Sequence, residues 1–379
     1  MKKILLVAAS VTLLAAGCQK TEIVNPVGEP ALSFTTGMNK LTKAVGTADA
    51  DSTGMNNLQA QDFRVWAYGD FEDENTLNTK ELDEIYDGMA NLNVYYTKTT
   101  TEQGVGSSES WAPSKEYYWP GVDKNLRFFA VSGADCGDDL STTANVTIDI
   151  TRTPGEEGAS DTVVSTLTVK NFAVDSLAPN KDLMVADFVC QNQSKKEVEL
   201  NFRHALSKVQ FLFKTIDGSD RDVFVQSLEV AGINTVSTLT VTPDTEENAA
   251  KPISFAWAPA AEPKTFADDY VTVPEDFPTN VEYMQGATED NTAMKLTPAA
   301  ETFATWLVVP QNIEGYQVKV LYVIGERQFE SIFTLSSENL TSWEPNQYVR
   351  YTVTLAPNLI SFVPKVEDWD NPTDVGYQN

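Results

Sequence analysis

The chain has 379 residues, of which 42% are hydrophobic and 10% are aromatic, so it can bury a substantial core and is not an intrinsically disordered protein. Its formal net charge is −27 at pH 7, and such a charge repels nucleic-acid phosphates and anionic lipid headgroups. Composition therefore argues against nucleic acid as a partner, and the length favours two domains.

Residues 1–17 have the layout of a secretory signal peptide: two lysines, an apolar run, and small residues that end before Cys18. The apolar run is too short to span a bilayer, which takes about 20 residues. Small residues before a cysteine are typical of bacterial lipoproteins, in which cleavage leaves that cysteine at the N-terminus to carry acyl chains such as palmitate. We expect lipidation at Cys18 and an outer-membrane anchor; an ordinary secretory signal that contains a cysteine is the alternative.

Short strands dominate the rest of the chain. Alternating β-formers separated by Gly, Pro, Asn and Asp turns predict antiparallel strands, and the long helices of a parallel α/β fold are not apparent. The polar stretch 191–196 separates two strand-rich halves, so we expect β-sandwich domains at residues 44–194 and 195–379. The expected strands cover residues 63–69, 146–150, 165–169, 198–202, 208–213, 239–242, 305–310, 317–325, 328–335 and 349–364.

Candidate catalytic and metal-binding residues are few. His204 is the only histidine, which argues against Ser-His-Asp and Cys-His catalysis; its place after an alternating strand predicts a hydrogen-bonded structural role. Residues 49–60 resemble a calcium loop at three positions but lack the glutamate at the twelfth, so a solvated loop is favoured. Phosphate-binding glycine patterns are missing. We expect no enzymatic activity, no metal and no cofactor.

The remaining cysteines and the clustered aromatic residues each allow two interpretations. Cys136 and Cys190 could pair in an oxidising compartment, but they have no metal-binding spacing, and we favour two thiols. The aromatic segment 111–121 could stack on sugar rings, or fill a core together with residues 126–131. The core interpretation is favoured.

Several segments together resemble the fimbrillin family, the lipoprotein precursors of type V pilus subunits. They are the signal with Cys18, residues 31–47, residues 181–186 with 198–213, and residues 342–369. The most specific are DLMVA followed by FRHALSKVQF, and the ending Tyr-x-x-Tyr-x-Val-x-Leu with Val-x-x-Trp. The resemblance covers essentially the whole chain and implies two tandem transthyretin-like antiparallel β-sandwich domains.

The resemblance also implies a removable first strand. Leu32 and Phe34 alternate with polar residues, so this segment can lie as a strand with its apolar face inward. In fimbrillins, a trypsin-like cut after a basic residue removes the strand together with the lipid. Here Lys43, followed by Ala44, occupies the matching place, where family members usually have arginine. Residues 18–43 are therefore expected to form a lipidated pro-segment.

Loss of that strand would open an apolar groove whose backbone can pair with another chain. A strand from the next subunit could refill the groove by β-strand addition, and such head-to-tail contacts build a filament. The expected donor is the C-terminal segment 359–369, and the expected partners are other pilus subunits, in a homo- or heteropolymer at the cell surface. The side chains expected to fill the groove are Ile360, Phe362, Val366 and Trp369.

Other functions stay open at the level of the sequence. Residues 31–43 could be a permanent first strand of a non-polymerising surface lipoprotein, because accessory, tip and anchor subunits share the fold. Such a protein could bind a glycan through the aromatic residues between Trp111 and Trp119. A carboxylate-based hydrolase is the weakest alternative, since no pair of acids stands out from the acidic background.

Overall fold

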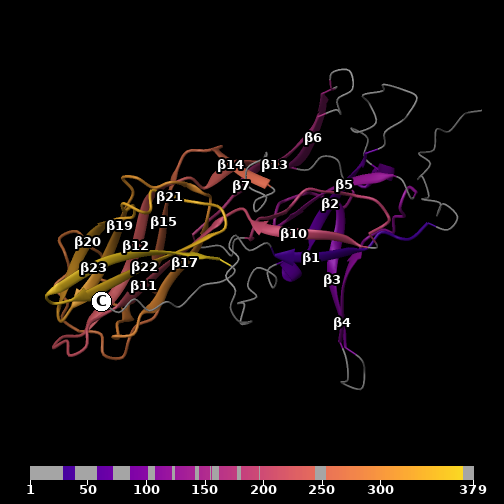
Figure 1. The fold of residues 1–379 in the computed structure, drawn as a ribbon. Helices are drawn as coiled ribbons and strands as arrows, with labels where there is room; N and C mark the ends of the chain where they lie inside the picture. Colours follow the sequence, from indigo (N-terminus) through magenta and orange to yellow (C-terminus); the bar gives the residue numbers. More distant parts are fainter. Residues whose placement is uncertain are drawn as a thin grey trace, which may run out of the picture.

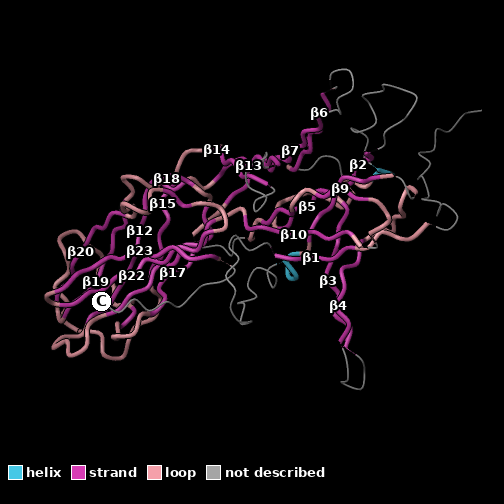
Figure 2. Tube along the Cα trace, in the orientation of Figure 1, coloured by secondary structure: helices cyan, strands magenta, loops and turns pink. Residues whose placement is uncertain are grey.

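The computed structural model describes residues 29–38, 58–70, 86–100, 107–121, 124–140, 145–153, 155, 162–176, 181–195, 197–243 and 253–369. Nearly all regular structure within these ranges is β, which confirms the all-β prediction (Figure 2). The helical pieces of the described chain are one turn at residues 58–61 and the 3-10 helix η2 (Tyr86–Gly88).

The first sheet closes on itself. Its strands are β1 (Phe34–Met38), β2 (Phe63–Asp70), β3 (Leu92–Thr100), β4 (Ser107–Pro113), β5 (Asn125–Ser132), β8 (Met184–Ala186), β9 (Val189–Gln191) and β10 (Val198–His204). Their hydrogen-bonded order is β2-β3-β4-β1-β10-β8-β5-β9, and β2 also pairs with β5. The strands from β2 round to β5 therefore form a ring, in which β8 and β9 pair with successive parts of β5. A ring has no open edge, and removing one member creates two.

A second, four-stranded sheet combines distant parts of the chain. It contains β6 (Val146–Thr153), β7 (Thr162–Ala173), β13 (Val236–Pro243) and β14 (Ile253–Pro259). The order is β14-β13-β7-β6, and all three pairings are antiparallel. Figure 1 shows β7, β13 and β14 between the first sheet and the C-terminal strands.

The C-terminal strands form a β-sandwich. One sheet has the order β17-β11-β22-β23 and the other β15-β12-β19-β20. Across the two layers, Trp306 contacts Phe266 edge-on with ring centroids 5.4 Å apart, and Phe333 stacks on Phe362 at 5.0 Å. These sheets, with the short strands beside them, are built from β11 (Ser207–Lys214), β12 (Val223–Ile233), β15 (Lys264–Asp269), β16 (Met294–Lys295), β17 (Glu301–Val308), β18 (Gln311–Asn312), β19 (Gln317–Ile324), β20 (Arg327–Thr334), β21 (Ser342–Trp343), β22 (Gln347–Ala356) and β23 (Leu359–Asp368).

The alternating sequence of β2 places side chains in two apolar cores. Val65 and Ala67 belong to the core inside the first sheet, whereas Trp66 and Tyr68 belong to the core that continues into the C-terminal sandwich. Successive side chains of a strand point to opposite faces, so β2 is buried on both. The ring and the sandwich are thus joined by apolar contacts as well as by the second sheet.

Strand pairing does not change at the expected boundary between residues 194 and 195. The polar residues before that point form a turn, and β10, which follows it, pairs with β1 and β8 of the first sheet. Pairing changes at Ala205 and Leu206, between β10 and β11, and both residues are buried. The division into domains at residues 44–194 and 195–379 stays a prediction.

The strand expected over residues 349–364 is instead a hairpin. Strand β22 ends at Ala356, the chain turns at Pro357 and Asn358, and β23 returns antiparallel to β22. Proline and asparagine favour turns, so the local signal for this break was present in the sequence.

Candidate functional site

Strand β1 occupies an interior position between β4 and β10. It pairs in parallel with β10 along its whole length, from Phe34 opposite Val198 to Met38 opposite Phe202. On its other side Phe34 lies opposite Trp111 of β4. The strand therefore closes the ring, as the first-strand prediction requires.

Backbone hydrogen bonds hold the residues around the start of β1 from both sides. The Leu32 N–H donates to the Tyr117 carbonyl oxygen at 2.7 Å, and the Trp119 N–H donates to the Pro30 carbonyl oxygen at 3.1 Å. On the β10 side, the Val198 N–H donates to the Ser33 carbonyl oxygen at 2.8 Å. Extraction of this segment would leave groups of both neighbours unpaired.

The inward side chains of this segment are buried in the first core. Leu32 and Phe34 are each 4% exposed. Phe34 meets Phe63 and Phe128 edge-on, with ring centroids 6.4 and 6.3 Å apart. Full burial of such side chains stabilises a protein by about 1.5 to 3 kcal/mol each, so this pair contributes about 3 to 6 kcal/mol. Met38 packs against the same core at the far end of the strand.

The outward side of β1 borders a pocket, and at Gly37 it lies close to the side chain of Asn201. A pocket of about 430 Å³ lies beside the strand, lined among others by Thr35, Glu109 and Trp111. At Gly37 a Cβ atom would lie 2.4 Å from the side-chain Oδ1 of Asn201, so a larger residue there requires the Asn201 side chain to move.

The aromatic segment serves the core of the ring. Tyr117 and Trp119 are 1% and 0% exposed, and Trp111 packs against Phe63 at 4.9 Å and Tyr96 at 5.3 Å. This agrees with the favoured core interpretation. A glycan-stacking platform needs exposed ring faces, which the two buried side chains do not offer.

The expected donor segment lies at the edge of the C-terminal sandwich. Strand β23 pairs with β22, and it ends the sheet order on that side. Ile360 and Val366 are 47% and 43% exposed. Phe362 is half-buried between Tyr351 and Phe333, with ring centroids 5.0 Å from each. The segment is therefore an edge strand with exposed apolar side chains, and its role as a donor stays a prediction.

The end of the donor segment is fixed by a buried histidine. The Trp369 ring stacks on His204 with centroids 4.0 Å and planes 3° apart, and Trp369 is 2% exposed. His204 Nδ1 lies 2.8 Å from an oxygen of Asp182, whose backbone N–H donates to Gln61 Oε1 at 2.8 Å. His204 ends β10 and is hydrogen-bonded, as its structural interpretation predicted. Sequence reasoning missed Asp182, which precedes the apolar run of β8 and carries no local signal of its partner.

Cys136 and Cys190 are not joined by a disulfide within the described chain. Cys136 is buried, and burial raises the pKa of its thiol to about 12, whereas Cys190 is exposed. The protonated thiol of Cys136 is a poor nucleophile at neutral pH, because reactivity belongs to the thiolate.

Three predicted features cannot be placed. Cys18, Lys43 and Ala44 lie outside the described residues, as do residues 49–57 of the calcium-like loop. Among the residues that the structure does describe, no group of three or more His, Cys, Asp and Glu side chains could hold a metal ion. In the same ranges, no helix has the length and apolarity needed to cross a membrane.

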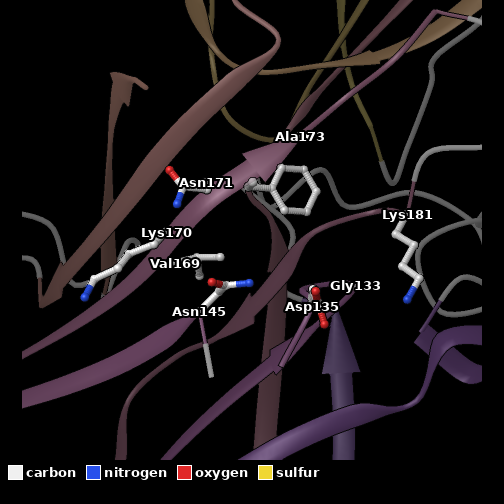
Figure 3. Close-up of a pocket in the computed structure, with 9 residues that line it drawn as sticks. Gly133, Asp135, Asn145, Val169, Lys170, Asn171, Ala173 and Lys181 are labelled. Carbon is white, nitrogen blue, oxygen red and sulfur yellow. The ribbon is translucent and has the colours of Figure 1, made fainter. Parts of the chain in front are cut away.

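A second pocket, of about 470 Å³, lies at the junction of the first two sheets (Figure 3). It is lined by residues 169–173 of β7, which include Lys170, and by Gly133, Asp135, Asn145 and Lys181. In Figure 3 the amino groups of Lys170 and Lys181 point away from each other. A ligand site usually has convergent polar groups, so this pocket gives no indication of one.

Comparisons with known proteins agree with this architecture. A family model described as fimbrillin-like matches residues 42–369. Curated protein sequences give no match. Among solved structures, a fimbrial protein from Bacteroides vulgatus ATCC 8482 is similar, with 17% identity, a TM-score of 0.50, and coverage of 89% of this chain and 99% of that one. A fimbrial assembly protein from Parabacteroides distasonis ATCC 8503 has 13% identity and a TM-score of 0.36, covering 90% and 98% of the two chains.

Proposed function

The chain belongs to the fimbrillin-like family, and from that membership we propose that it is a structural subunit of a cell-surface pilus with a role in adhesion. Its assembly proceeds by strand exchange, in which β1 is removed and β23 of a neighbouring subunit takes its place. The chain acts as a building block and not as an enzyme, and it needs no cofactor. Its partners are other pilus subunits.

The place of β1 in the ring is the observation that carries this proposal. Strand β1 pairs with β10 and β4, and the inward side chains of its segment, Leu32 and Phe34, are buried. If β1 leaves, the ring opens at two edges, and about 3 to 6 kcal/mol of apolar burial is lost. Since whole domains are stable by only about 5 to 15 kcal/mol, the empty slot strongly favours a replacement strand.

The N-terminal segment controls when the slot becomes free. Lipid at Cys18 holds the precursor on the outer membrane, and a cut between Lys43 and Ala44 separates β1 from the rest of the chain. Until that cut, β1 and the remainder belong to one molecule, so β1 competes at high effective concentration against any donor. Processing therefore acts as the trigger, and the product joins head-to-tail into an open filament.

N-terminal sequencing of the chain in filaments shed from cells tests this proposal. We expect the filament form to start at Ala44. A filament form that still starts at lipidated Cys18 would show that the first strand stays in place, and assembly by this route would then be wrong.

A further inference from the structure

We propose that the donor is a second copy of this chain, and that its β23 enters the slot in the direction of β1 with Phe362 at the place of Phe34. This inference rests on the proposed function and adds to it the partner, the direction and the register. In this register Ile360 takes the place of Leu32, and Val366 takes that of Met38. The donor strand therefore runs parallel to β10, as β1 does.

Two segments of the chain are alike in sequence. Residues 31–38 read ALSFTTGM and residues 359–366 read LISFVPKV. Both contain a branched aliphatic residue, a serine and a phenylalanine in succession. When the two segments are aligned on that phenylalanine, three apolar pairs coincide. They are Leu32 with Ile360, Phe34 with Phe362, and Met38 with Val366. Alternate residues of a strand share one face, so both segments present the same apolar face.

Ile360 and Val366 would be more buried in the slot than they are on their own subunit. Leu32 is 4% exposed in the slot, whereas Ile360, which would replace it, is 47% exposed on its own subunit. Val366 is 43% exposed there and would move to the place of Met38, at the rim of the same core. Transfer therefore buries apolar surface that the free subunit leaves in water. Phe362, Trp369 and Glu367 leave packed positions; Glu367 is buried and ion-paired with Arg350 and Lys365.

Pro364 has no backbone N–H to donate. In the proposed register it stands at the place of Thr36. The bond from Val198 to the Ser33 carbonyl shows that odd-numbered residues of this segment face β10, so Thr36 faces the β4 side. Because Thr36 does not face β10, a proline at this place removes no backbone bond to β10.

Pro364 also argues for the direction of insertion. If β23 entered in the opposite direction with Phe362 in the same pocket, Pro364 would stand at the place of Leu32. The Leu32 N–H donates to the Tyr117 carbonyl oxygen at 2.7 Å, and proline cannot supply that bond. The parallel direction keeps an N–H at this place, because Ile360 occupies it.

The remaining position is Lys365, which would stand at the place of Gly37. The atom nearest to a Cβ there is the side-chain Oδ1 of Asn201, at 2.4 Å, and that side chain can rotate away. Glu199 is exposed and lies two residues before Asn201 on the same face of β10. Opposite charges on neighbouring strands attract, so Glu199 favours a lysine at this place.

A pair of chimeric full-length chains tests the fit without any filament. In the first, residues 31–38 are replaced by LISFVPKV; in the second they are replaced by ISFVPKVE, the same sequence shifted by one residue. We expect the first chimera to keep the urea midpoint of the parent and slow amide exchange in β10. The shifted chimera should lose this protection, because its apolar side chains point outward. The same comparison is repeated with Asn201→Ala added to both chimeras. This substitution removes the contact between the side chain at position 37 and Asn201.

Equal behaviour of the two chimeras, with and without Asn201→Ala, would overturn the register. That result would leave the proposed pilus function intact, because strand exchange could then use another segment. The chimeras therefore separate a failure of this inference from a failure of the function.

Disulfide trapping in filaments tests the direction and the partner. Cells produce two full-length copies in a Cys190→Ser background, one with Val363→Cys and the other with Glu199→Cys. Because Thr35 lies opposite Glu199, the proposed register brings these cysteines together, and covalent dimers of the two copies should form. The matched control pairs Lys365→Cys with Glu199→Cys, which is displaced by two residues and should give few dimers.

The outcomes of the trapping experiment distinguish errors in the register, in the donor and in the proposed function. Filaments of the parent chain with dimers only in the displaced pair would contradict the register. If neither pair cross-links in filaments, a slot that holds this chain would contradict the direction and register, and a slot that holds a different protein would contradict the second copy as donor. Absence of filaments from the parent chain would contradict the proposed function itself, and this inference with it.

Discussion

Phe34 anchors β1 by its contacts with two other aromatic rings. It is 4% exposed and meets Phe63 and Phe128 edge-on. The neighbouring Thr35 points outward and lies beside a pocket. The two residues therefore offer a matched pair, in which one change removes core packing and the other does not.

We predict that Phe34→Ala lowers the free energy of unfolding of the full-length chain by about 3 to 5 kcal/mol, because it leaves a cavity in the core. Thr35→Ala should lower it by less than about 1 kcal/mol. Urea unfolding followed by tryptophan fluorescence measures both values. Similar values for the two variants would contradict the inward position of Phe34.

Trp369 holds the end of β23 on its own subunit. Its ring stacks on His204, which is itself bound to Asp182. Trp369→Ala removes this stack, so we expect faster hydrogen exchange of the β23 amides, with β12 and β19 unchanged. Val363→Ala is the control, since Val363 is 57% exposed and its truncation should leave exchange as it is. Unchanged exchange in Trp369→Ala would contradict this anchoring role.

The two faces of strand β23 have different expected roles in the proposed filament. Ile360 and Val363 are both exposed in the subunit, so aspartate at either place should leave its stability nearly unchanged. In the proposed register Ile360 enters the core of the next subunit, whereas Val363 takes the outward place of Thr35. A buried unpaired carboxylate is strongly unfavourable.

We therefore predict that Ile360→Asp abolishes filament growth and that Val363→Asp retains it. Electron microscopy of filaments from cells with equal amounts of precursor measures the difference. Equal loss in both variants would indicate that the two faces of β23 are not distinguished, and normal filaments from Ile360→Asp would contradict its place in the core.

Many strands were predictable, but β3, β4, β12, β14 and β15 were not among those expected, and the pairing of the strands was not predictable. Alternation in FRVWAYG and KVQFLF identified β2 and β11, because a strand buried against a core repeats every two residues. The parallel pairing of β1 with β10 joins residues about 160 positions apart, as from Phe34 to Val198, and leaves no local trace. The second sheet was missed for the same reason, since β7 and β13 are separated by several other strands.

The candidate site was predicted in part. The alternation of Leu32 and Phe34 identified the inward side chains of the first strand. The partners that shape the slot could not be identified, because Tyr117, Asn201 and Asp182 come from three separate segments that only folding brings together. Pro357 and Asn358 did signal the turn into β23, and the expected single strand over residues 349–364 overlooked them.

In the proposed function, assembly of the whole molecule into a filament depends on one strand of the first sheet. The ring of the first sheet is complete only while a strand lies between β4 and β10, and in the proposed assembly that strand changes from the chain's own β1 to a neighbour's β23. Before processing, the tether between β1 and the ring keeps the slot occupied. The proposed function therefore predicts a protein that is stable as a precursor and reactive toward its own kind after a single cut.

The most direct test of this claim is the content of this chain in fibres made by cells that carry Lys43→Gln. Lys40→Gln is the matched control, since it removes the same charge three residues earlier. We predict that Lys43→Gln precursor stays lipidated on the outer membrane and is missing from fibres, while Lys40→Gln enters them at the parental level. Normal fibres that contain the Lys43→Gln chain would contradict the claim.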